Sequence, residues 1–141
     1  MGFSLIGAFA IIGISIIICS DIFVGTLLPT VTDFDNSYNE MVKRCVEKIQ
    51  TNINITNVVT TINGSNYDHN ISLENTGSAS LKISDFIVMI NGTIYQFHCS
   101  DAHLYPQKET NLYIYNLSGS GEKKLTINTE NGISDYYNYE I

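Results

Sequence analysis

The first 28 residues constrain this chain more than any other stretch. From Phe3 to Ser20 there are 18 consecutive uncharged residues, most of them Ile, Phe, Ala or Leu. That length is enough to cross a hydrocarbon core of about 30 Å as a helix. Asp21 interrupts the run and Ile22–Leu28 resumes it, so on a helix rising about 1.5 Å per residue Asp21 can reach the far interface. The pattern predicts a transmembrane helix over residues 1–28.

Three other structures can produce such a run. A cleaved signal peptide is disfavoured, because no Lys or Arg precedes Lys43 and no small-residue cleavage site follows the run. A buried core helix is disfavoured, because 18 uncharged residues are long for a chain of 141. A pilin-type helix, whose apolar face lies in a filament core, remains an open alternative.

Charge and cysteine content restrict the function of the remaining residues. The 14 acidic and 7 basic residues give a net charge of −7, which argues against nucleic-acid binding, since that needs a basic surface. Cys19, Cys45 and Cys99 do not make a disulfide framework. Cys45 and Cys99 can pair if the domain is exported, although two free thiols are the simpler expectation.

Signals for membrane orientation conflict. Lys43 and Arg44, the nearest basic residues after the span, weakly favour a cytoplasmic C-terminal domain. Five glycosylation sequons, a mild excess over the roughly three expected by chance, favour an exported one. The candidate acceptors are Asn54, Asn63, Asn70, Asn91 and Asn116. Alternatively, these Asn, Ser and Thr residues simply mark turns.

Residues 29–50 are expected to form a helical stalk. Apolar or bulky residues recur at three- and four-residue steps, which is typical of an amphipathic helix. They are Phe34, Tyr38, Met41, Val42, Cys45, Val46 and Ile49. Pro29 is expected to kink or break the helix where the stalk begins. The stripe needs a partner, either the following β domain or the same helix of a second chain.

From Thr51 the apolar period changes from 3.6 to 2. Asn63-Gly64, Asn91-Gly92 and Asn131-Gly132 are hairpin turn signals, and Asp85 marks a bulge or bend. Seven strands are expected, over 52–62, 67–74, 81–90, 93–99, 111–117, 124–129 and 133–141. The predicted fold is therefore mainly β: an N-terminal helix followed by an immunoglobulin-like antiparallel sandwich over residues 51–141. Without Trp it is not a true immunoglobulin domain.

No constellation of residues predicts an enzyme, a cofactor or a phosphate site. His98, Cys99, Asp101 and His103 are the best metal candidates, but neighbouring residues on a regular strand point to opposite faces, so a polar strand end is the simpler interpretation. Exposed tyrosines favour protein contact, although they also fill sandwich surfaces. The candidate contact residues are Tyr113, Tyr115, Tyr136, Tyr137 and Tyr139. The C-terminal strand, if it is an edge, is a candidate for strand addition.

Four segments resemble the archaeal flagellin-like family, and in particular the FlaF family of archaellum accessory proteins. They are the N-terminal MGFS with its apolar helix, Ile71–Tyr95 with its NTGS turn, the LYP turn at Leu104–Pro106, and the closing Thr129–Ile141. The resemblance covers nearly the whole chain and contains no catalytic signature.

The resemblance implies a role in motility. Proteins of this kind remain in the cell envelope as stators, anchored in the cytoplasmic membrane with the sandwich in the pseudoperiplasm, where it binds the S-layer protein. The implied partners are the S-layer, the sister protein FlaG, the membrane and a second copy. A minor pilin or archaellin-like filament subunit is the alternative. It is disfavoured because no basic residue precedes Gly2, as peptidase processing would require.

The anchor prediction can be tested by placing a charge at the centre of the span. Replacing Ile14 with Arg should block stable insertion, because a central Arg costs about 2.5–3.5 kcal/mol on insertion scales. Membrane fractionation should show loss of the variant from the membrane. Unchanged fractionation would argue against an anchor.

Overall fold

The structure is a computed structural model that describes residues 2–141, with side chains from residue 4 onward. Met1, at the start of the predicted anchor, lies outside the described residues. The chain divides into two compact units, Met1–Lys43 and Arg44–Ile141. Each unit is described by itself.

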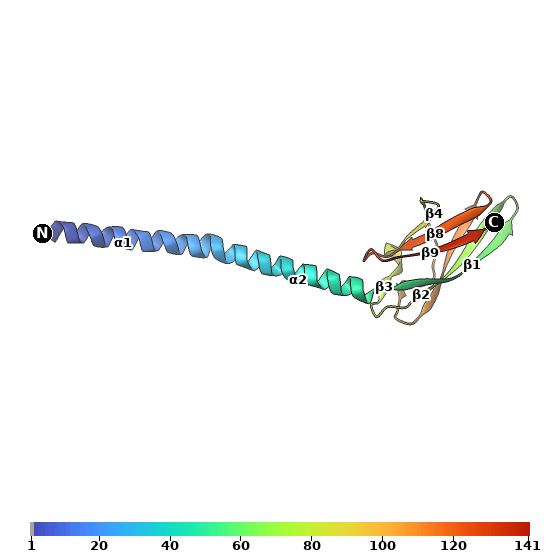
Figure 1. Ribbon diagram of the computed structural model, residues 1–141, viewed down its shortest axis with the longest axis horizontal. Coiled ribbons are helices and arrows are strands. Elements are labelled where there is room, and N and C mark those ends of the chain that lie inside the picture. Colours follow the sequence, from blue (N-terminus) through green and yellow to red (C-terminus); the bar gives the residue numbers. More distant parts are fainter. Residues whose placement is uncertain (1) are drawn as a thin grey trace. The chain divides into compact units, whose positions relative to one another are not determined.

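The N-terminal third, from Gly2 to Gln50, is helical throughout, without a break at Pro29. Helix α1 (Gly2–Ile22) continues through one π-helical segment, η1 (Phe23–Leu27), into helix α2 (Leu28–Gln50) (Figure 1). The Leu28 N–H donates to the Phe23 carbonyl, five residues back. Pro29 has no N–H to donate, and the wider π-helical turn before it relieves the clash of its ring with the preceding turn. The predicted break at Pro29 is therefore wrong, whereas a kink there stays a prediction.

Nine strands form three antiparallel sheets among the described residues. Strands β1 (Ile53–Asn63), β2 (Asn66–Asn75) and β7 (Glu109–Leu117) make one sheet, in the order β1-β2-β7. The second has the order β5-β4-β8-β9, with β4 (Ile87–Ile90), β5 (Thr93–Tyr95), β8 (Glu122–Asn128) and β9 (Ser134–Glu140) (Figure 1). The short strands β3 (Leu81–Lys82) and β6 (His103–Leu104) pair with each other.

The core lies between the two larger sheets. Side chains from both sheets are fully buried, namely Ile71, Leu73, Val88, Leu112, Leu125 and Ile127. They alternate with exposed residues along each strand, as a sheet with one buried face requires. The predicted class, an N-terminal helix followed by an antiparallel β-sandwich, is confirmed.

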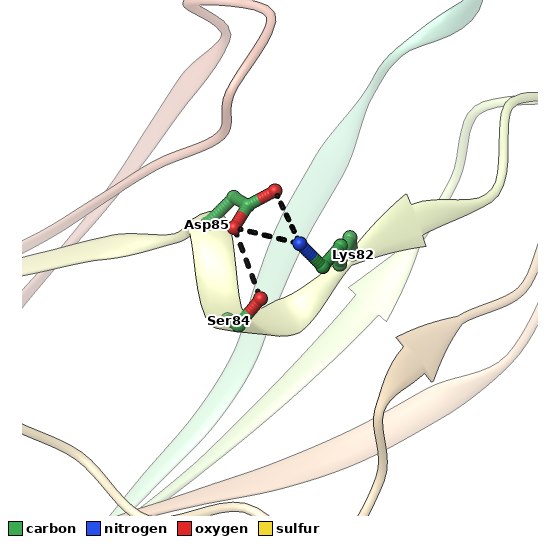
Figure 2. A network of polar contacts seen from close by, with 3 residues as sticks. All are labelled: Lys82, Ser84 and Asp85. Atoms are coloured by element: carbon green, nitrogen blue, oxygen red, sulfur yellow. Dashed lines mark hydrogen bonds and ion pairs between the residues drawn. The ribbon is translucent and has the colours of Figure 1, made fainter.

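The expected strand over residues 81–90 is split by a 3-10 turn at Ile83–Asp85. With strict alternation after Leu81 and Ile83, the Asp85 carboxylate would enter the core. The turn adds one residue, so Ile83 and Phe86 are both buried while Asp85 reaches the surface. There it bonds the Ser84 hydroxyl at 2.9 Å and pairs with the Lys82 ammonium at 3.3 Å (Figure 2). The bend expected at Asp85 is present and is this turn.

The expected strand over residues 93–99 is shorter than predicted. Strand β5 ends at Tyr95, and His98 forms a bridge with Tyr113 of the other sheet. The backbones of these two residues exchange two hydrogen bonds of 2.8 Å. The chain thus leaves one sheet for the other after Tyr95, which the period-2 pattern could not indicate.

The three predicted Asn-Gly turns all join hairpins. Asn91 and Gly92, with φ of 49° and 82°, make the turn between β4 and β5, the left-handed conformation that two-residue hairpin turns favour. In the β1–β2 hairpin Asn63 still pairs with Asn66, so the turn consists of Gly64 and Ser65, one residue later than predicted. Gly132 lies in the β8–β9 connection with φ of 74°.

The NTGS turn connects the last turn of α2 to the sandwich. The Gln50 carbonyl, at the helix end, accepts the N–H groups of Ser78 and Ala79 at 2.8 and 3.1 Å. A side chain at Gly77 would place Cβ 2.3 Å from the Gln50 oxygen, so only glycine fits there. The fully buried Asn75 amide donates to the carbonyls of Ala79 and Leu104 and accepts the Gly77 N–H.

Replacing Asn75 with Ala should lower the free energy of unfolding by about 3 kcal/mol. Two carbonyls lose their amide donor, and each unpaired buried polar group costs roughly 1–3 kcal/mol. Denaturant unfolding of the detergent-solubilised protein, followed by tyrosine circular dichroism, measures the change. The exposed Asn138→Ala is the matched control and should stay within about 0.5 kcal/mol of the wild type. Equal stability of the two variants would contradict the assigned role of Asn75.

Candidate interaction surfaces

The predicted metal candidates are engaged elsewhere. The Cys99 sulfur lies 3.3 Å from the Thr110 hydroxyl, which donates to the Asp101 carboxylate at 2.6 Å. His98 pairs through its backbone, and the His103 ring stacks on Tyr105. Within the described residues, no group of three or more His, Cys, Asp or Glu side chains is arranged to hold a metal.

The structure separates the five candidate tyrosines into two kinds. Tyr113 and Tyr115 lie on the outer face of β7 with their rings stacked 6.4 Å apart, and Tyr115 is 61% exposed. Tyr136 on β9 is 62% exposed, and the Lys124 ammonium lies 4.5 Å above its ring. Tyr137 and Tyr139 pack against the core from the opposite face of β9. Three of the five are therefore available for contact.

A buried aromatic cluster surrounds His69 and was not predicted from the sequence. This ring is 1% exposed and lies between Tyr67 and Tyr139, with centroid distances of 5.0 and 4.6 Å. Its Nδ1 is 3.2 Å from the Thr60 hydroxyl, while its Nε2 is buried without a partner. The signal was present, since His69 shares the alternation of the buried Ile71 and Leu73.

Burial determines the protonation of this cluster. Desolvation lowers the pKa of His69 to about 4, against the opposing effect of the Asp68 carboxylate, so the ring is neutral at physiological pH. Burial also raises the pKa of Tyr139 well above its ordinary value. The cluster is thus an uncharged part of the core.

The outer face of the four-stranded sheet carries a row of directly opposed residues, here called the apolar row. It consists of Ile94, Met89, Thr126 and Tyr136, one from each strand. Ile94 and Tyr136, at its two ends, are 67% and 62% exposed. Opposed side chains lie about 4.5–5.5 Å apart on neighbouring strands, so the row forms one contiguous surface.

A cleft of about 570 Å³, here called the β5 cleft, lies at one end of this row. Its apolar lining includes Phe86, Ile87, Ile94 and Phe97. It lies where the chain leaves β5 for the other sheet.

The sequons are unevenly distributed. Four of the five asparagines lie on the β1-β2-β7 sheet, namely Asn54, Asn63, Asn70 and Asn116. The fifth, Asn91, lies in the β4–β5 turn. Asn54 and Asn91 are exposed, whereas Asn70 is half-buried and its amide oxygen has no solvent contact.

Within the described residues no disulfide is formed, and the apolar stripe of the stalk is exposed. Cys19, Cys45 and Cys99 are free thiols. One helix, Ser4–Gln50, is long and apolar enough to cross a membrane. The apolar stripe of α2 is exposed, with Phe34 at 73% and Met41 at 54%.

Comparison with known proteins places this architecture in a family. The sequence profile of the archaeal-type flagellins matches residues 2–139. The chain belongs to the archaeal-type flagellin family. No curated protein matches it.

Among solved structures, this family member is similar to the archaellum periplasmic stator protein FlaG from Sulfolobus acidocaldarius. The TM-score is 0.54 at 20% identity, over 63% of this chain and 99% of that one. The likeness confirms the fold. Both the family and this neighbour are structural components of the archaellum. A Bacillus subtilis subsp. subtilis strain 168 lipoprotein, ycdA, matches over 65% of this chain and 37% of its own at 15% identity, but its TM-score of 0.43 supports no argument.

Stability should fall as the pH is lowered through the titration of His69. Between pH 6.5 and about 4 the unfolded chain binds a proton that the folded chain does not. Protonation of His69 in the unfolded chain therefore lowers the free energy of unfolding by up to about 1.4 kcal/mol for each unit by which the pH falls in this range. Denaturant titrations from pH 7 to 4.5 measure the slope. His69→Phe should reduce it, and the exposed His103→Phe should not; equal slopes in all three proteins would refute the assignment.

Proposed function

We propose that this protein is a static, membrane-anchored component of the archaellum whose sandwich binds the S-layer outside the cytoplasmic membrane. In this proposal residues 1–28 are the transmembrane anchor, 29–50 the stalk and 51–141 the binding domain. The protein has no catalytic role. It works with FlaG and can self-associate as a dimer.

The single observation that carries the membrane anchor in this proposal is the exposed apolar surface of α1. Large apolar side chains from Leu5 to Ile22 are each 53–70% exposed. Transferring such a surface from water is favourable by about 25 cal/mol per Å² of apolar area. Lipid can cover it on all sides of the helix, and the 18-residue uncharged run has the length of a bilayer core.

The printed role of the solved neighbour supports a stator. FlaG from Sulfolobus acidocaldarius is described as a periplasmic stator protein of the archaellum, and the match covers 99% of its chain. That role supports an outward position for this sandwich in the proposal. An exported domain would also make the sequons usable.

The sequon distribution favours one face for docking. Glycans on Asn54, Asn63 or Asn116 would cover the β1-β2-β7 sheet, where Tyr113 and Tyr115 lie. The apolar row lies on the other sheet, and Tyr136 at its end combines apolar area with a hydroxyl, as contact residues often do. The exposed Asn91 lies in the β4–β5 turn, at the strand ends and not on this face, so we assign S-layer contact to the Tyr136 face.

The alternative is a minor pilin or archaellin-like filament subunit. The match to the flagellin family as a whole favours it, because the exposed face of α1 can equally be covered by neighbouring helices in a filament core. The two roles differ in location: a subunit is distributed along purified filaments, whereas a stator stays with the envelope.

Full-length protein in nanodiscs should bind isolated S-layer sheets saturably. Tyr136→Ala should weaken binding roughly tenfold or more, since truncating an interface aromatic costs about 2 kcal/mol. Tyr115→Ala, on the other sheet and equally exposed, is the matched control and should bind like the wild type. Sedimentation with the sheets gives the affinity.

The outcomes separate the hypotheses. Loss of binding in Tyr115→Ala alone would move the contact to the β1-β2-β7 sheet. Absence of wild-type binding, together with labelling along purified filaments, would replace the stator proposal by the filament subunit.

A further inference from the structure

Strand β5 is a short, apolar edge. It ends the four-stranded sheet, and within the described residues its backbone pairs only with β4. Natural edge strands are protected by a charge, a proline, a bulge or a very short length. Thr93, Ile94 and Tyr95 provide no charge, proline or bulge, so their short length is the guard of this edge, and Ile94 is 67% exposed.

The other outer edges of the two larger sheets each carry a local contact. His98 bonds to Tyr113 at the outer edge of β7 through two backbone hydrogen bonds. Strands β1 and β9 lie beside each other, and the Asp135 carboxylate accepts the Ile55 N–H at 2.7 Å. These contacts leave much of those edges open, so the choice of β5 rests on the apolar cleft beside it.

The hairpin geometry shows which backbone groups are open. In a two-residue turn the flanking residues form the hydrogen-bonded pair, and such pairs alternate with non-bonded ones along the ladder. Thr93 opposite Ile90, and Tyr95 opposite Val88, therefore bond to β4. The N–H and C=O of Ile94 point away from β4, toward an incoming strand.

The β5 cleft adjoins this edge and supplies side-chain contacts. Ile94 and Tyr95 belong both to β5 and to the cleft lining, with Phe86 and Phe97 beyond them. A strand added at β5 directs alternate side chains to the two faces of the sheet. One set can enter the cleft, so the site favours an extended segment with apolar residues at every second position.

We propose that the edge of β5 and its cleft bind an extended, apolar segment of the S-layer protein by strand addition. The inference rests on the proposed function for the source of the segment. The dimensions favour a short segment over a second folded domain. A three-residue edge is about 10 Å long, whereas stable interfaces between folded proteins engage roughly 20–30 residues a side.

The experiment uses full-length protein in nanodiscs and isolated S-layer sheets as the probe. Ile94→Pro removes the outward N–H without removing a bond to β4, and Ile94→Lys adds the charge that guards natural edges. Both should weaken binding roughly tenfold or more. Ile94→Val keeps the N–H and the apolar contact and should bind within about twofold of the wild type. Ile62→Lys, at an isoleucine 79% exposed on β1, is the matched control for charge and should do the same.

Each outcome decides one point. If Ile94→Pro lowers the midpoint of denaturant unfolding, its loss of binding is not specific to the edge. Ile94→Lys alone then tests whether the edge of β5 binds the S-layer. Wild-type affinity in Ile94→Lys, with binding lost in Tyr136→Ala, would overturn strand addition and leave the proposed function intact. A dimer that Ile94→Lys converts to a monomer, without loss of S-layer binding, would assign the edge to a second copy and overturn the proposal. Absence of wild-type binding overturns the proposed function, and the source of the segment with it.

Discussion

The hydrogen bonds around Gln50 and Asn75 hold together the point where the helix enters the sandwich. A helix end leaves carbonyls without donors, and here the NTGS turn supplies two N–H groups to the last of them. The same turn is held by the Asn75 amide, which also bonds Leu104 of β6. The helix end, the turn and the short β3–β6 pair are therefore one polar network. Gly77 permits it, because any side chain would separate the turn from the helix end.

A second constraint recurs at three places in the sandwich. Buried apolar residues normally alternate, yet Ile55 and Val58, Ile83 and Phe86, and Ile114 and Leu117 are separated by three positions. At each place one extra residue is present. Strands β1 and β7 each show a register shift in their pairing with β2, and the third place is the 3-10 turn before β4. Each insertion lets two apolar residues face the core and sends a polar residue outward. The irregularities thus follow from the positions of the apolar side chains.

The helix, the hairpins and the two-sheet class could be predicted from the sequence, because they depend on local period and turn chemistry. Spacing by three is visible at Ile83 and Phe86, and Asp85 indicated a bend there, but the local pattern did not indicate that the bend would divide the strand in two. The crossing of the chain after Tyr95 depends on Tyr113, distant in sequence, and had no local signal. The tyrosines show the same limit. Alternation along β9 separates Tyr136 from Tyr137 and Tyr139, but the His69 cluster required knowing which strands face each other.

The π-helical segment at Phe23–Leu27 has a consequence for the rotational phase of the helix. A turn closed by five-residue bonds contains one residue more than its α-helical equivalent. On a helix with 3.6 residues per turn, one residue is about 100° of rotation. The direction in which Phe34 and Tyr38 project, relative to Gly7 and Gly13 of α1, is therefore fixed by this single extra residue. The apolar stripe of α2 and the side of α1 that carries Gly7 and Gly13 are in this way held in one rotational phase on a continuous helix.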